Sequence, residues 1–66
     1  MIKIESSYGH VFLINVHNIC YIQTGYNNMQ YYWMNIVFKT SSTDCIVSFK
    51  TKEEREVQLN KLIREV

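Results

Sequence analysis

The chain has 66 residues with seven basic and six acidic side chains, a balance of +1 that predicts no strong attraction to phosphate or anionic lipid. Its apolar fraction of 47% excludes a disordered tail, and no apolar run reaches the roughly 20 residues that a membrane-spanning helix needs. We expect one small domain over residues 1–66. Because so short a chain buries only roughly 60% of its unfolded surface, its stability is marginal without help, which normally comes from disulfides, a metal or a partner subunit.

The first part of the chain predicts three short strands. Apolar and charged side chains alternate over residues 2–5, and a glycine-containing turn leads to a second strand over residues 10–15. Two asparagines then interrupt the apolar run, and their side chains suit a tight bend. A third strand is expected over residues 19–24, followed by a loop over residues 25–28.

Residues 29–40, MQYYWMNIVFKT, form the longest run rich in aromatic and β-branched side chains and predict a central strand. The two-residue period of a strand places Tyr31 and Trp33 on one side, and Tyr32 and Met34 on the other. Both sides are largely apolar, whereas a strand with one wet face alternates cleanly. We therefore expect a packed neighbour on each side of this strand.

The last part of the chain predicts a strand and then a helix. A polar turn over residues 41–44 and a fifth strand over residues 45–50 complete an antiparallel meander of four or five strands. The period then becomes helical over Lys52–Glu65, and Thr51 and Glu54 have the spacing of a capping box. The apolar residues at helical spacing are Leu59, Leu62, Ile63 and Val66, with Val57 on the flank. The predicted fold is α+β, with one C-terminal helix packed on one face of the sheet.

One helix leaves part of such a sheet uncovered. A helix of this length measures about 21 Å by about 10 Å, which covers one face of a small sheet and not two. An exposed apolar patch usually marks an interaction surface, so the second face or an edge strand is expected to contact another copy of the chain or another protein. We predict a non-catalytic homo-oligomer. Its interface or binding surface is expected to contain Tyr21, Tyr31, Tyr32, Trp33 and Met34.

The sheet aromatics, Tyr26 included, also suggest an alternative function, a stacking platform for single-stranded nucleic acid. Lys3, Lys39 and Lys50 would then follow the nucleic-acid backbone. Affinity for nucleic acid comes largely from phosphate neutralisation, and a net charge of +1 supplies little of it. Aromatic residues on strands are also typical of cores and subunit contacts, so protein binding is the first interpretation.

A second alternative is a metal- or thiol-dependent activity around His17 and Cys20, which are spaced as H-x-x-C. With His10 and Cys45 they equal in number the four ligands of a zinc site, but no C-x-x-C pair is present and nothing orients a cysteine–histidine pair. We therefore predict free, buried thiols, no cofactor, no metal and no catalytic residue. Free thiols, with an N-terminus that lacks the features of a signal peptide, indicate the cytoplasm.

The N-terminal third resembles the opening of the small flagellar FlbD-type proteins. The matching features are the start M-I-K-I, the segment G-x-x-F-x-I-N at Gly9, Phe12, Ile14 and Asn15, and the pair Ile19 and Ile22. An acidic helix start at Glu53-Glu54 is similar in outline. The chain departs from the family in having no proline, where the family usually has a proline-containing turn. The resemblance implies a β-rich layout that ends in a helix, and a non-enzymatic role in motility or assembly.

Overall fold

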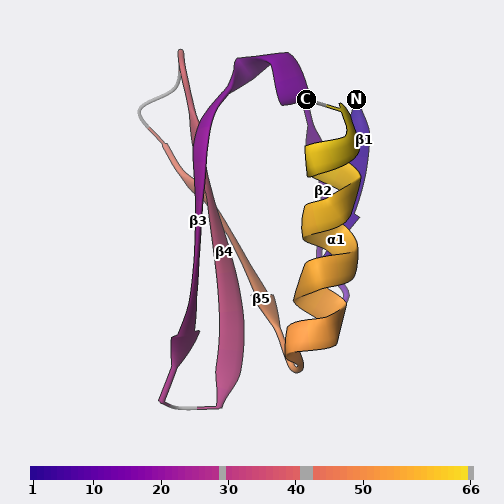
Figure 1. Ribbon diagram of the computed structural model, residues 1–66, viewed down its shortest axis with the longest axis vertical. Helices are drawn as coiled ribbons and strands as arrows, with labels where there is room; N and C mark the ends of the chain where they lie inside the picture. Colours follow the sequence, from indigo (N-terminus) through magenta and orange to yellow (C-terminus); the bar gives the residue numbers. More distant parts are fainter. Residues whose placement is uncertain (29, 41–42, 66) are drawn as a thin grey trace.

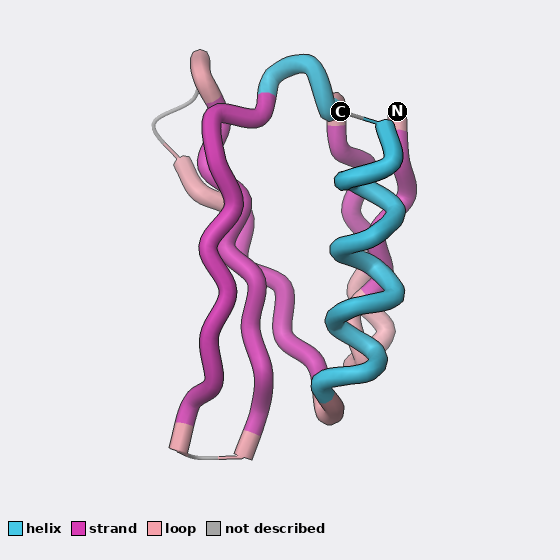
Figure 2. Tube along the Cα trace, viewed as in Figure 1, coloured by secondary structure: helices cyan, strands magenta, loops and turns pink. Residues whose placement is uncertain are grey.

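The computed structural model describes residues 1–28, 30–40 and 43–65, which form two packed layers (Figure 1). One layer is an antiparallel three-stranded sheet with β4 at its centre. Its strands are β3 (Ile19–Asn27), β4 (Tyr31–Phe38) and β5 (Cys45–Phe49). The other layer contains the hairpin of β1 (Ile2–Glu5) and β2 (Val11–Ile14), with α1 (Lys52–Glu65) beside it (Figure 2).

The α+β class, the antiparallel pairing, the central position of β4 and the C-terminal helix are confirmed. The five strands of the described residues do not form one meander, however, because the β1–β2 hairpin separates from the larger sheet. A 3₁₀ turn, η1 (Val16–Asn18), carries the chain across from one layer to the other (Figure 1). The Asn15 side chain accepts a hydrogen bond from the His17 backbone N–H at 3.1 Å, so the predicted asparagine bend is present and makes this crossing.

The core lies between the two layers, because hairpin and helix together cover a sheet face that the helix alone is too narrow to cover. Its buried apolar residues come from both layers and are Ile4, Ile14, Met34, Ile36, Val47, Phe49 and Leu62. Burying each such side chain contributes roughly 1.5–3 kcal/mol relative to leaving it exposed. The hairpin therefore supplies cover that the sequence pattern assigned to the helix alone.

The predicted loop over residues 25–28 is wrong, because β3 continues to Asn27. Gly25 pairs with Trp33 and Tyr26 pairs with Tyr32, so contacts with the aromatic strand β4 outweigh the low strand propensity of glycine. The turn that follows is closed by a hydrogen bond from the Gln30 N–H to the Asn27 carbonyl at 3.0 Å. Four residues with predicted places in the central strand, the polar turn and the helix stripe lie outside the described residues: Met29, Ser41, Ser42 and Val66.

The helix begins where its cap predicts. The Thr51 hydroxyl oxygen accepts a hydrogen bond from the Glu54 backbone N–H at 3.1 Å. The Glu54 carboxylate does not complete the reciprocal half of the capping box and instead accepts a hydrogen bond from the Ser7 hydroxyl. Ser7 in turn accepts from the Lys50 N–H at 3.0 Å, so the turn of the hairpin is joined to the start of the helix. None of the described helical segments has the length and hydropathy needed to cross a membrane.

Candidate binding surface

Among the described residues, no second layer lies over the face of the three-stranded sheet that points away from the hairpin and the helix (Figure 1). Its residues are those that alternate with the buried positions of each strand, and cross-strand register places them side by side. We call this surface the outer face; it comprises Tyr21, Gln23, Gly25, Asn27, Tyr31, Trp33, Asn35, Val37, Ile46 and Ser48. None of these side chains is charged, and Ile46 is 62% exposed.

The indole of Trp33 lies directly over Gly25 on the neighbouring strand. A Cβ atom added at Gly25 would stand 2.3 Å from Cζ2 of Trp33, far inside van der Waals contact. Glycine therefore provides the space in which the indole lies across β3. This packing leaves Trp33 half-buried although it lies on the face that points away from the hairpin and the helix.

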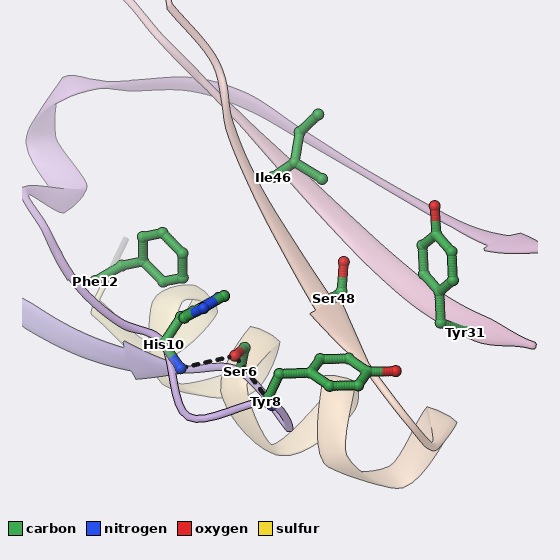
Figure 3. Close-up of a pocket in the computed structure, with 7 residues that line it drawn as sticks. All are labelled: Ser6, Tyr8, His10, Phe12, Tyr31, Ile46 and Ser48. Carbon is green, nitrogen blue, oxygen red and sulfur yellow. Dashed lines mark hydrogen bonds between the residues drawn. The ribbon is translucent and has the colours of Figure 1, made fainter.

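A cleft of about 300 Å³ opens where β5 meets the turn of the hairpin (Figure 3). Its lining residues are Ser6, Tyr8, His10, Phe12, Tyr31, Ile46 and Ser48. A shallower depression of about 250 Å³ on the outer face shares Tyr31 and Ile46 with it, so the two are continuous. The Ser6 hydroxyl oxygen accepts from the backbone N–H groups of Tyr8, at 3.1 Å, and His10, at 3.0 Å. These two bonds hold the turn in place, so Ser6 has a structural role in this wall.

The structure divides the five predicted interface residues between two sides of the sheet. Tyr21, Tyr31 and Trp33 lie on the outer face. Met34 is fully buried in the core and Tyr32 faces the helix, so the inclusion of these two residues in one exposed surface is corrected. The physical reason is the strand period, which sends even-numbered residues of β4 toward the hairpin and helix.

Comparison of the chain with protein-family models, with curated proteins and with solved structures gives no match. The chemistry of the surface is therefore argued from its own side chains. Interface cores in proteins are depleted of charge and enriched in aromatic residues, and their anchors are often tryptophan or tyrosine. The outer face has this composition. The side-chain amide of Asn35, near its centre, donates a hydrogen bond from Nδ2 to Asp44 Oδ2 at 3.1 Å.

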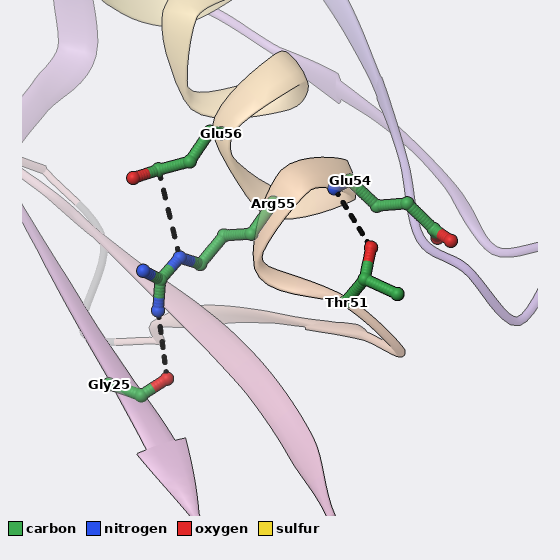
Figure 4. A network of polar contacts seen from close by, with 5 residues as sticks. All are labelled: Gly25, Thr51, Glu54, Arg55 and Glu56. Atoms are coloured by element: carbon green, nitrogen blue, oxygen red, sulfur yellow. Dashed lines mark hydrogen bonds and ion pairs between the residues drawn. The ribbon is translucent and has the colours of Figure 1, made fainter.

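Arg55 is a buried charged residue that the sequence reasoning missed. Its side chain extends over the inner face of the three-stranded sheet, which is the face that the hairpin and the helix cover. There its guanidinium lies 5.4 Å from the centre of the Tyr32 ring and donates to the Gly25 carbonyl at 3.0 Å (Figure 4). Its Nε lies 3.8 Å from a carboxylate oxygen of Glu56. The signal was present, because Arg55 stands four residues before Leu59 on the apolar stripe of the helix.

The residues considered for metal or thiol chemistry lie on different elements. Both cysteines are free, but Cys20 is exposed at an irregularity of β3, which corrects the prediction that both thiols are buried. Burial raises the pKa of the Cys45 thiol. His17 is exposed in η1 and His10 lines the cleft. The described part of the chain contains no group of three or more His, Cys, Asp or Glu side chains placed to hold a metal ion.

Proposed function

We propose that this chain is a non-catalytic protein-binding and assembly module that acts as a homo-oligomer through its outer face. The observation that carries the proposal is a sheet face whose side chains are aromatic, aliphatic or neutral polar and which no layer formed by the described residues covers. Uncharged surface that is rich in aromatic side chains has the composition of a protein contact site. The resemblance to FlbD-type proteins supports the same class of role, and two free thiols suit a reducing cytoplasm.

The size of the chain favours self-association. Its accessible surface is 4580 Å², so a standard contact of roughly 800 Å² per partner would remove roughly one sixth of it from water. A two-fold contact uses the same patch on both copies and needs no further protein. Association also stabilises the folded state by mass action, which adds to the small free energy of unfolding that we expect of a 66-residue domain.

Light scattering on a sizing column at micromolar protein tests the proposal. We expect a mass above the 7.9 kDa of one chain. Ile46→Lys should lower that mass, because it puts a charge on the outer face where the two depressions meet. Leu13→Lys is the control, since Leu13 is 68% exposed on β2, in the other layer. A wild-type mass of one chain, or an Ile46→Lys variant that assembles like the wild type, would contradict the proposal.

The alternative of single-stranded nucleic-acid binding keeps one specific support, which is that Tyr21, Tyr31 and Trp33 share the outer face. Stacking of bases on this face would quench the fluorescence of Trp33, the one tryptophan of the chain. We expect no quenching by a mixed-sequence oligonucleotide at low salt. Saturable quenching that weakens with salt would replace protein binding by this alternative.

A further inference from the structure

The two layers are joined along β5 and open along β3. Beside β5, the Ser7 N–H donates to the Ser48 carbonyl at 3.3 Å and the Lys50 N–H donates to Ser7. On the opposite side, a groove of about 450 Å³ separates β3 from the C-terminal half of α1. Its walls include Ile19, Ile22 and Thr24 of β3 and Leu59 and Ile63 of α1. The apolar interior of the molecule is therefore accessible from this side.

The β3 wall of the groove is a free sheet edge without charged side chains or proline, and its register irregularity lies at its start, between Ile19 and Tyr21. Edge strands of proteins are commonly short or carry lysine, proline or inward-pointing charges that block pairing with another strand. β3 has nine residues, and residues 18–38 include no charged side chain, no histidine and no proline. The guanidinium of Arg55 donates to the Gly25 carbonyl, which leaves residues 21–24, where β3 is regular and lines the groove, for an added strand.

The α1 wall presents Ile63, which the core does not use, beside Leu59, which packs against the edge of the core. Ile63 belongs to the stripe that the sequence assigned to the core, yet it is 57% exposed. Arg55, Leu59 and Leu62 take the positions that face the sheet, which turns Ile63 toward the groove. Leu59 and Ile63 have the spacing i and i+4, so they form one row along the helix.

We propose that a second copy of this chain binds here, with β3 antiparallel to β3 and the Leu59–Ile63 row against its counterpart, about a two-fold axis. The open side of the molecule contains the β3 edge in one layer and the Leu59–Ile63 row in the other. A two-fold axis therefore brings the β3 edge of one copy against the β3 edge of the other, and the helix row of one copy against the helix row of the other. The pairing brings uncharged strand to uncharged strand, joins the two three-stranded sheets and closes both grooves.

This inference rests on the proposed self-association but uses a surface that shares Tyr21 alone with the residues of the outer face. Ile63→Lys tests it, because each copy would then place a cation next to its symmetry mate. Val57→Lys is the matched control, since Val57 is also an aliphatic residue of α1 with 57% exposure and lies away from the groove. We expect Ile63→Lys to halve the mass of the wild-type particle and Val57→Lys to leave it unchanged, with circular dichroism showing both variants folded.

A charge-reversal mixture tests the two-fold symmetry itself. Ile63→Glu alone should dissociate like Ile63→Lys, and an equimolar mixture of the two variants should regain the wild-type mass, because opposite charges then meet across the axis. A mixture that stays dissociated, or an Ile63→Lys variant with the wild-type mass, overturns the inference. Loss of assembly in Ile46→Lys with no effect of Ile63→Lys would leave the proposed function standing and remove this second contact.

Discussion

Successive residues of the three-stranded sheet point to opposite faces and have different surroundings. Ile36 is fully buried beneath the hairpin and the helix, whereas Ile46, on the neighbouring strand, is 62% exposed on the outer face. The two side chains are chemically identical, so the difference comes from the second layer and not from hydropathy. An apolar residue on a strand therefore indicates that a face needs cover, while the packing of distant elements decides which face receives it.

Replacing Ile36 and Ile46 separately by alanine measures this difference in burial. The change at Ile36 has the largest expected effect on the free energy of unfolding. Ile36→Ala removes a buried side chain and leaves a cavity, so we expect it to lower the free energy of unfolding by about 2–5 kcal/mol. Ile46→Ala should lower it by less than about 1 kcal/mol in dilute protein, because its side chain is already largely in water. Urea unfolding of both variants at a concentration that prevents assembly gives the comparison. Equal losses would mean that the outer face is covered.

Arg55 of α1 is the one charged residue that is buried among the residues the structure describes, and its removal should have the next largest effect. Arg55→Ala leaves the Gly25 carbonyl without its donor and uncovers the Tyr32 ring, so we expect a loss of about 1.5–3 kcal/mol in the free energy of unfolding. Arg55→Met refills the space over the ring without the charge and should recover part of the loss. If Arg55→Met is no more stable than Arg55→Ala in urea unfolding, the hydrogen bond and not the packing dominates.

Local patterns predicted the elements well and their surroundings poorly. The helix start follows from the Thr51 cap, and the central place of β4 follows from its two apolar sides. The period of a strand tells which residues share a face, but it does not tell that Tyr32 and Met34 face the covered side. That assignment depends on the hairpin, which lies far away in sequence. The local sequence predicts a loop at Gly25 for the same reason, because its cross-strand partner Trp33 lies on another strand.

On the outer face, the position of the Trp33 indole depends on the absence of a side chain at Gly25. Gly25→Ala places a methyl group in the space of the Trp33 ring, so the ring should swing away at a cost of about 1 kcal/mol. We expect red-shifted emission and faster acrylamide quenching of Trp33. Gly9→Ala is the control, because Gly9 has a φ of +88° with nothing within 4 Å of the added carbon. It should lower stability through backbone strain and leave Trp33 emission unchanged; an unshifted spectrum in Gly25→Ala would contradict the packing.

The two thiols give the smallest effect and compare the covered side of the sheet with its open edge. Burial raises the pKa of the Cys45 thiol above 9.0, so the folded state keeps a proton that the unfolded state loses as the pH rises past that value. This contribution to stability is complete below pH 9 and declines above it. The decline, followed by urea unfolding at a series of pH values, should be shallower in Cys45→Ala than in the wild type. Equal pH dependence in the two proteins would mean that Cys45 is as open to water as the exposed Cys20.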